Sequence, residues 1–399
     1  MAHGGDALAR HEGKVIFVPY ALPGEEVLVE LTEEKAKYAR AHLLEVITPS
    51  PQRVEPRCPH FGTCGGCHWQ HIAYETQLSL REEILRSQLE RIGHLTDVPI
   101  QPSLSMSNPW HYRNHVQLHL DEAGGLGFMA AKEHRVVAIQ QCPIMHPLIA
   151  DVLGGLDIDF PELKQVSLRA GIATGDQMLI LETSGETAPA LEADVPVCCI
   201  LLLNDGTPIT YMGDSYINEN LAGKSFRISA TSFFQVNTVQ TEKVLETVSH
   251  YLNPQGSEVL LDIYCGVGTF GLSLADEVKE VIGIEVNEAA IADARFNSQG
   301  MDNVQFLRGR AEELLPELEE KVDVAILDPP RQGCHKKALA ALLKLAPKKI
   351  VYVSCDPATL ARDVGRLVPG GYELVEVQPV DMFPQTSHVE AIALLHLTS

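Results

Sequence analysis

The sequence predicts a multidomain chain of mixed α/β and α+β class, with a small N-terminal β-barrel, a central α+β unit and a C-terminal α/β domain. The length supports several domains, because 399 residues are more than one hydrophobic core usually organises. Short alternating strand patterns fill residues 13–47, whereas strands alternate with helical patterns from about Phe226 onward. The second pattern is typical of a parallel sheet covered by helices. We therefore expect domains at residues 1–48, 49–225 and 226–399.

A proline-rich linker separates the first two domains. Residues 15–18 and 27–31 have the strand patterns expected of the barrel, and the prolines within residues 49–56 then hold the chain extended. Beyond this linker, residues 73–92 have the pattern of an amphipathic helix that Gly93 ends. The strand-like runs of the central unit lie at residues 116–120, 136–139, 166–168 and 178–181.

The charge is strongly acidic but unevenly distributed. Lys and Arg number 31 against 53 Asp and Glu, a net charge of −22, which argues against a protein held to nucleic acid or membrane by bulk attraction. The first 150 residues carry only −4 of this charge and 12 of the 16 histidines, so any contact with a polyanion is expected in this part of the chain.

The chain contains no run of the roughly 20 apolar residues that a membrane helix needs, and residues 1–10 lack the apolar core of a signal peptide. We expect a cytoplasmic protein that does not contact a membrane. Nothing in the sequence specifies an oligomeric state, and a monomer is the simplest expectation.

The first chemical motif is a cluster of cysteines. Cys58, Cys64 and Cys67 lie within ten residues in a glycine-rich stretch, and Cys142, followed by proline, could supply a distant fourth thiol. Four thiolates suit either a structural zinc ion or an iron–sulfur cluster. The uneven spacing, the distant fourth ligand and the Cys-Pro step favour a 4Fe–4S cluster. The histidines that could substitute as ligands are His60, His68 and His71.

The second motif is a glycine-rich turn between an apolar strand at residues 259–263 and a helix. Gly266 and Gly268 would let the backbone approach a nucleotide-like ligand closely. Glu285, at the end of the next strand, is placed to accept hydrogen bonds from ribose hydroxyls. Asp262 ahead of the turn and the missing third glycine of the dinucleotide fingerprint favour S-adenosylmethionine over NAD.

Polar residues follow two later strands of the same domain. Asp328 and Arg331 come after one apolar run, and Cys355 comes after the next. Ligands of open α/β sheets bind outside the carboxyl ends of the strands, so these side chains should face the same crevice as Gly266. Cys355 is the cysteine there whose neighbours suit nucleophilic chemistry.

Two further groups near the C-terminus could accept protons. His388 and Glu390 lie on one face of a strand-like segment. Cys198 and Cys199, by contrast, belong to an apolar run and are expected in the core.

Taken together, these motifs resemble those of RNA uracil-5-methyltransferases, specifically the iron–sulfur-containing enzymes that methylate bacterial 23S ribosomal RNA. The N-terminal residues 4–10 and 22–25 resemble the TRAM domain of that group, an RNA-binding β-barrel. The matching motifs span almost the whole chain in the family's order. They are Cys58-x5-Cys64-x2-Cys67 with Cys142, residues 233–237, Asp262 to Gly268, Asp328-Pro329-Pro330-Arg331-x-Gly333, Ser354 to Pro357, and His388-Val389-Glu390.

The resemblance implies a Rossmann-like C-terminal methyltransferase domain, a central iron–sulfur domain and ribosomal RNA as partner. Cys355 would be the nucleophile and Glu390 the base that removes the C5 proton. Cys58, Cys64, Cys67 and Cys142 would hold the 4Fe–4S cluster. The residues that would bind S-adenosylmethionine or line its pocket are Gln235, Tyr264, Gly266, Gly268, Thr269, Glu285 and Asp328.

Three alternatives remain open. A transfer RNA uracil-5-methyltransferase would use the same chemistry, although the bacterial enzymes usually lack the barrel and the cluster. An amino-group methyltransferase would explain Asp328-Pro329-Pro330 but needs neither Cys355 nor Glu390. An iron–sulfur RNA-binding protein without catalysis would not require these two residues either.

Overall fold

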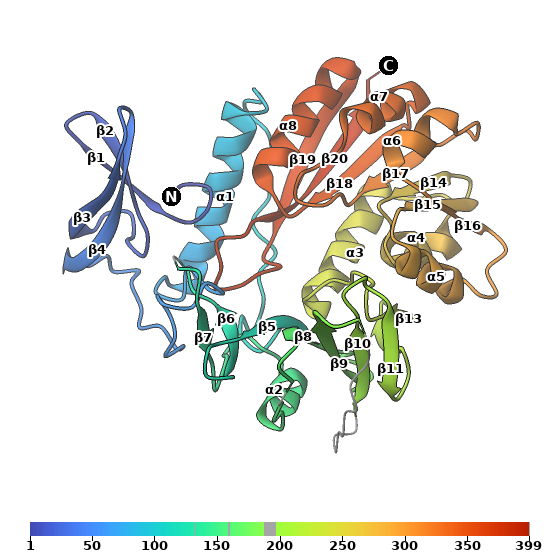
Figure 1. The fold of residues 1–399 in the computed structure, drawn as a ribbon. Helices are drawn as coiled ribbons and strands as arrows, with labels where there is room; N and C mark the ends of the chain where they lie inside the picture. Colours follow the sequence, from blue (N-terminus) through green and yellow to red (C-terminus); the bar gives the residue numbers. More distant parts are fainter. Residues whose placement is uncertain (132, 159, 187–196, 399) are drawn as a thin grey trace.

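The computed structural model describes residues 1–131, 133–158, 160–186 and 197–398 and places them in three regions (Figure 1). The N-terminal region is a sheet ordered β1-β2-β4-β3, in which β2 and β4 run parallel. Its edges are β1 and β3, so the hydrogen bonding of the described strands does not close the predicted barrel. Bulges between β3 and β4 bend the sheet instead. The strands are Ala7–His11 (β1), Lys14–Val18 (β2), Glu26–Glu34 (β3) and Tyr38–Thr48 (β4).

Helix α1, Tyr74–Arg91, confirms the predicted helix but packs differently from the expectation. We assigned it to the central unit, whereas its apolar side chains join the core of the C-terminal domain. Leu80, Ile84, Leu85 and Leu89 are buried there against helix α8, Pro357–Leu367. Burying each such side chain contributes about 1.5–3 kcal/mol. The helix therefore ties the central segment to the C-terminal domain.

The central region is a mixed sheet ordered β11-β10-β9-β8-β5-β6-β7, with helix α2, Pro147–Gly154, packed on β8 and β9. Strands β5, β7, β8 and β9 lie on the predicted strand-like runs. The cysteine pair expected in the core lies on β10, where Cys199 is buried and Cys198 is half-buried. The strands are His115–Leu120 (β5), Leu126–Met129 (β6), Val136–Ala138 (β7), Leu163–Ala170 (β8), Gln177–Thr183 (β9), Cys198–Leu202 (β10) and Pro208–Met212 (β11).

A β-hairpin crosses the predicted boundary at residue 225. Its strands are β12, Tyr216–Leu221, and β13, Lys224–Ser229. Ile217, Phe226 and Ile228 on this hairpin are buried in the same core as helix α3 and the C-terminal sheet. The hairpin thus packs with the C-terminal domain on both sides of that boundary.

The C-terminal sheet has the order β16-β15-β14-β17-β18-β20-β19. Strands β14 to β18 run parallel, as predicted, while β20 runs antiparallel to both β18 and β19. The order reverses at β14, and ligands of such sheets bind at that point, beyond the carboxyl ends. The strands are Val259–Ile263 (β14), Glu280–Glu285 (β15), Val304–Arg308 (β16), Val324–Leu327 (β17), Lys349–Ser354 (β18), Tyr372–Val380 (β19) and Glu390–Leu397 (β20).

Helices cover both faces of this sheet. Helices α1, α6, α7 and α8 share one apolar core, and helices α3, α4 and α5 share the other with the hairpin. The helices not yet bounded are Thr238–Leu252 (α3), Thr269–Leu274 (α4), Glu288–Asn297 (α5), Ala311–Leu314 (α6) and Lys336–Leu345 (α7). In the part of the chain that the structure describes, none of the helices has the length and apolar character to cross a membrane.

Candidate active site

The glycine-rich turn lies between β14 and α4 and is shaped by unusual backbone angles. Gly266 and Gly268 have φ angles of 56° and 89°, and Tyr264 lies in the same left-handed region at 68°. Asp262 is fully buried, and its carboxylate accepts a hydrogen bond from the Gly271 amide at 2.8 Å. Glu285, at the end of β15, accepts from the Gly266 amide at 3.2 Å. These bonds hold the turn against the acidic end of the neighbouring strand.

A cavity of about 790 Å³ opens beside this turn, at the carboxyl ends of the parallel strands. Its size is that of a small-molecule site. Eight of the predicted residues line it: Gln235, Tyr264, Gly266, Glu285, Asp328, Arg331, Cys355 and Glu390. The Gln235 side chain donates to Asp328 at 3.2 Å, which joins the segment ahead of α3 to the end of β17.

Two of the predicted cofactor-binding residues do not line the cavity. Gly268 is the N-cap of α4, where its left-handed backbone begins the helix, and Thr269 is the first residue of that helix and is buried. The structure also adds residues to which the sequence analysis assigned no role. Phe233 and Val286 line the cavity with 62% and 55% of their side chains exposed, and Arg113 reaches it from the central region. Exposed apolar side chains at a cavity are the signal that would have found the first two.

The pairing of β18 with β20 brings Cys355 and Glu390 together. Ser354 and Ala391 are the last pair of this antiparallel ladder, and Cys355 and Glu390 are the next residue on each chain segment. The two side chains are close enough that the Glu390 carboxyl raises the pKa of the Cys355 thiol. Residues 35 positions apart in the sequence thus meet at one wall of the cavity.

Burial and nearby charges favour the protonated forms of both Cys355 and Glu390 in the free protein. Burial and the nearby Glu390 and Asp328 carboxyls raise the pKa of the Cys355 thiol to about 12, and Arg331 opposes them. Burial and Asp328 likewise raise the pKa of Glu390 well above its usual value. A carboxylate with a raised pKa is a strong base once it is ionised.

His388, the other predicted proton acceptor, is not among the residues that line the cavity. Its ring instead packs edge-on against Phe383 at 5.5 Å and against His68 at 6.1 Å. Burial and the neighbouring Arg331 lower the pKa of His388 to about 4, so the ring is neutral at neutral pH. Glu390 is therefore the better placed of the two groups.

We expect the charges around Cys355 to control its rate of alkylation. Asp328→Asn removes a charge that raises the thiol pKa, so the thiolate fraction near pH 8 should rise; Arg331→Met should lower it. The expected rate changes are about three- to tenfold in opposite directions, because one pKa unit is tenfold in thiolate. Mass spectrometry of the Cys355 peptide after iodoacetamide treatment measures both rates. Equal rates in the two variants would contradict this account of the site.

The four predicted cysteine ligands line a second cavity, of about 180 Å³, in the central region. Backbone amides approach several of the sulfurs: the Gly66 amide donates to Cys64 Sγ at 3.4 Å, and amides of Ile144 and Met145 donate to Cys142. Burial raises the pKa of the Cys67 thiol to about 12. In the described ranges, no group of three or more His, Cys, Asp or Glu side chains is arranged so that it could hold a metal ion.

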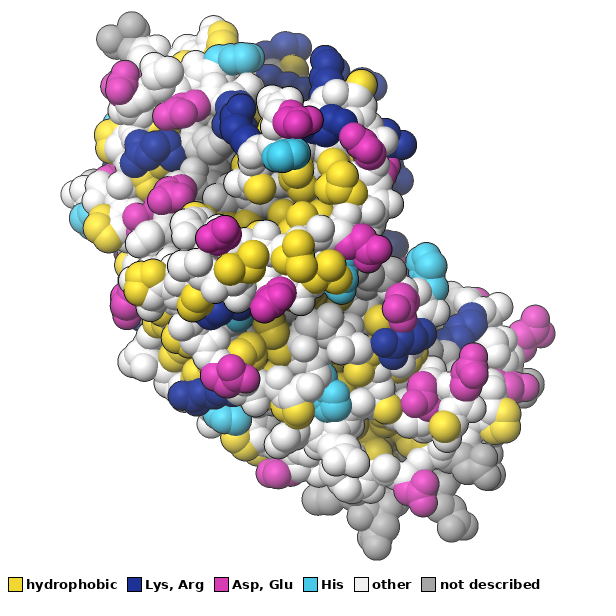
Figure 2. All heavy atoms as spheres, turned by 90° about the vertical axis from the view of Figure 1, so that its left-hand side faces the viewer, with side chains coloured by type: hydrophobic (Ala, Val, Ile, Leu, Met, Phe, Trp, Pro, Cys, Tyr) yellow, Lys and Arg dark blue, Asp and Glu magenta, His cyan; other side chains and the backbone are white. Residues whose placement is uncertain are grey.

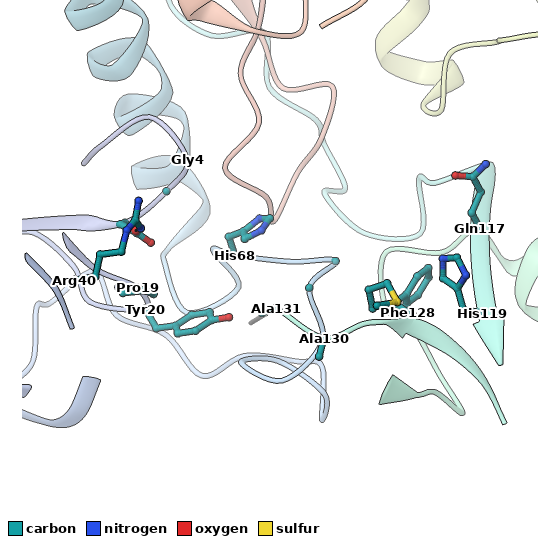
Figure 3. Close-up of a pocket in the computed structure, with 15 residues that line it drawn as sticks. Gly4, Pro19, Tyr20, Arg40, His68, Gln117, His119, Phe128, Ala130 and Ala131 are labelled. Atoms are coloured by element: carbon teal, nitrogen blue, oxygen red, sulfur yellow. The ribbon is translucent and has the colours of Figure 1, made fainter. Parts of the chain in front are cut away.

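A third cavity, of about 590 Å³, lies between the N-terminal and central regions (Figure 3). Arg40 on β4 and the loop residues Gly4 and Tyr20 line it from the N-terminal region, and Gln117 and His119 line it from β5. His68 also lines this cavity and, through its contact with His388, connects it to the wall that carries Glu390. The N-terminal segment also reaches the end of β18, since His3 Nε2 lies 3.4 Å from an Asp356 carboxylate oxygen, next to Cys355.

Comparison with known proteins agrees with this arrangement. Residues 206–398 match the family described as tRNA (uracil-5-)-methyltransferase, and residues 2–44 match the TRAM domain. Uncharacterized RNA methyltransferases of Thermosynechococcus vestitus and Halalkalibacterium halodurans are 39% and 38% identical to this chain; the matches cover 99% and 100% of it and 96% and 95% of those proteins.

A solved structure shares the whole architecture. It is a tRNA (uracil-54, C5)-methyltransferase of Pyrococcus abyssi in complex with S-adenosyl-L-homocysteine, 30% identical, with a TM-score of 0.77 over 98% of this chain and 97% of that one. The chain is thus an S-adenosylmethionine-dependent methyltransferase with an N-terminal TRAM domain, and it belongs to the RNA methyltransferases of the tRNA (uracil-5-)-methyltransferase family.

Proposed function

We propose that this protein transfers a methyl group from S-adenosylmethionine to C5 of a uridine in RNA, through a covalent adduct between Cys355 and C6. The observation that carries the proposal is the pair Cys355 and Glu390, opposite each other at one wall of the cavity. C5 of uracil is a poor nucleophile until a thiolate adds at C6, so the reaction needs a nucleophile and a base at one place. An amino-group methyltransferase needs neither.

The steps follow from these two residues. The Cys355 thiol first gives its proton to solvent, and the thiolate bonds to C6 while the electrons of the C5–C6 double bond move onto the C4 carbonyl oxygen as an enolate. C5 of this enolate then takes the methyl group from the donor, whose sulfur leaves with the bonding electron pair. Glu390 accepts the C5 proton, the C5–C6 double bond forms again, and the thiolate is expelled. Arg331, whose charge already acts on both groups, would stabilise negative charge on a uracil carbonyl oxygen. The uridine must be flipped out of its stack to reach Cys355.

Gln235, Tyr264, Gly266 and Glu285 would bind the methyl donor along the glycine-rich turn. Glu285 presents its carboxylate at the end of β15, as the ribose hydroxyls require. Asp328 would lie between the donor and the uracil, while Gly268 and Thr269 would shape the turn by starting α4.

We also propose that Cys58, Cys64, Cys67 and Cys142 hold a 4Fe–4S cluster. The support is that all four thiols line one cavity and that backbone amides donate to two of the sulfurs, those of Cys64 and Cys142. A cluster takes one thiolate on each iron, so its ligands surround a volume rather than a single point. The cluster would stabilise the fold of this segment, because uracil methylation transfers no net electrons.

The substrate we propose is ribosomal RNA, specifically 23S, because the cysteine motif resembles that group of enzymes. A transfer RNA is the second candidate, because the Pyrococcus abyssi enzyme that shares the architecture acts on tRNA. Mapping 5-methyluridine in both RNAs, from cells with and without this protein, tests the proposal. A site lost from ribosomal RNA supports the first substrate and a site lost from tRNA the second; no loss in either would overturn the function.

The surface offers a local site for the RNA backbone despite the acidic total. A cavity of about 380 Å³ between the TRAM domain and α1 is lined by Arg10, Lys37 and Arg91 together with Phe17 and Tyr38, and no acidic residue lines it. On the face that carries this domain, Lys and Arg side chains are concentrated toward the top (Figure 2). Basic groups beside aromatic rings suit single-stranded RNA.

We therefore expect RNA affinity to fall with salt, because phosphate contacts release counterions. Arg10→Ala and Arg91→Ala should each reduce the slope of log affinity against log salt by about 1. Lys279→Ala is the matched control: Lys279 is exposed just before β15, at the edge of the sheet opposite the active site. A slope that changes equally in all three variants would contradict an RNA site in this cavity.

A further inference from the structure

The loop that leads to Glu390 is held by a buried arginine on another element. We call residues 383–388 the base loop. Arg81, on α1, has only 1% of its surface exposed. Its guanidinium donates to the carbonyl oxygens of His388 at 3.1 Å, Thr386 at 2.9 Å and Phe383 at 3.2 Å. These three bonds bracket the loop from its first residue to its last.

The same guanidinium is fixed from two other directions. Asp381, just before the base loop, forms an ion pair with it at 3.1 Å, and the Trp69 ring lies beneath it at 5.2 Å. The Tyr74 hydroxyl in turn donates to Asp381 at 2.6 Å. Burying a cation is costly, and this one is paired through Nη2 and bonded through Nε and Nη2 while its buried Nη1 has no hydrogen-bond partner. Its place here therefore calls for a role in holding the loop.

Gln77 lies one helical turn before Arg81 on the same face of α1 and forms hydrogen bonds with the middle of the base loop. Its amide donates to the Gln385 side chain at 3.0 Å and accepts from the Gln385 backbone amide at 3.1 Å. Gln385 has a φ of 70°, a conformation that is strained for a residue with a side chain and needs support from its surroundings. The backbone amides of His68 and Trp69 supply more, since both donate to the Gln385 carbonyl.

We infer that Arg81 is a positioning residue for the base: it fixes the base loop so that the Glu390 carboxylate stays opposite Cys355. This inference rests on the proposed function. Arg81 bonds to the carbonyl two residues before Glu390 and to none of the residues that carry Cys355. Its loss should therefore affect the step that uses Glu390 more than the step that uses Cys355.

The test compares two steps of a single turnover on RNA that contains the target uridine. In Arg81→Met, we expect methyl transfer within about threefold of wild type but release of the product slowed about 10- to 100-fold, because a misplaced general base loses that much. Protein linked to methylated RNA should accumulate and survive denaturation. Arg81→Lys should behave similarly, because it keeps the charge but gathers its donors on one atom.

Leu85→Ala is the matched control, since Leu85 is fully buried on the same helix and is not among the side chains bonded to the base loop. It should lower the melting temperature without changing the ratio of the two rates. If both Arg81 variants fail to fold, Gln385→Gly replaces them: glycine tolerates the positive φ, and only the side-chain bond to Gln77 is lost. It should shift the ratio in the same direction.

Two results would overturn the inference. The first is that the Arg81 variants slow methyl transfer and product release by the same factor, and that Leu85→Ala does the same when its melting temperature falls by an equal amount. The other is an unchanged ratio in the variants that fold. A wild-type protein that forms neither adduct nor 5-methyluridine would instead refute the proposed function, so the two failures are distinguishable.

Discussion

Cys355→Ala is expected to abolish both the methylation of RNA and the formation of a covalent adduct. Without the thiolate, C6 gains no substituent and C5 never becomes nucleophilic, so the methyl donor is not consumed. The expected loss is at least about 10³-fold, the scale on which removing a covalent nucleophile acts. Labelled methyl transfer and a denaturing gel with 5-fluorouridine RNA measure the two quantities. Binding of the methyl donor should persist, because the glycine-rich turn lies between β14 and α4, whereas Cys355 follows β18 on another wall of the same cavity.

Glu390→Gln, unlike Cys355→Ala, is expected to allow the early steps of the reaction and to block the last one. The amide keeps the shape of the side chain but cannot accept the C5 proton, so addition and methyl transfer proceed and elimination stalls. Protein linked to methylated RNA should appear as a gel-shifted species that survives denaturation, and the double variant with Cys355→Ala should lack it. Normal release by Glu390→Gln would assign the base to another group, of which His388, in the same loop, is nearest in sequence.

The sequence could predict that these side chains meet at one cavity because several of them stand at strand ends. Asp328 and Cys355 each follow a run of apolar residues, and parallel strands bring such ends to one edge. What the sequence could not predict is the register: Glu390 meets Cys355 because β20 turns back antiparallel and pairs with β18. A shift of one residue would have placed Glu390 on the other face of the sheet.

The sequence also could not predict how distant segments pack against one another. The pattern of α1 predicted its length, yet an apolar face does not say which core it joins, and α1 packs on α8 rather than on the central sheet. Arg81 and Gln77 looked like ordinary polar positions of that helix. Their partners lie more than 300 residues away, in the base loop. Local periodicity carries no information on such contacts.

The cysteine cavity likewise combines residues that are close in sequence with one that is distant. The spacing of Cys58, Cys64 and Cys67 predicted a common site, and the structure places all three on one cavity wall with Cys142. Cys142 reaches it from the loop before α2. If a 4Fe–4S cluster occupies this cavity, Cys142 is the most informative ligand to replace. The other three cysteines are close in sequence and would lie near one another even without a cluster.

Anaerobically purified protein is therefore expected to be brown, with about four irons for each chain, because thiolate-bound iron–sulfur clusters absorb broadly in the visible range. Cys142→Ala should remove most of this absorption and iron. Cys198→Ala is the matched control: Cys198 is also a half-buried cysteine of the central region, but it lies on β10 and does not line the cysteine cavity. Visible spectra and metal analysis of the two variants decide the matter. Colourless wild-type protein with one zinc for each chain would replace the cluster by zinc, and equal colour in both variants would remove Cys142 from the ligand set.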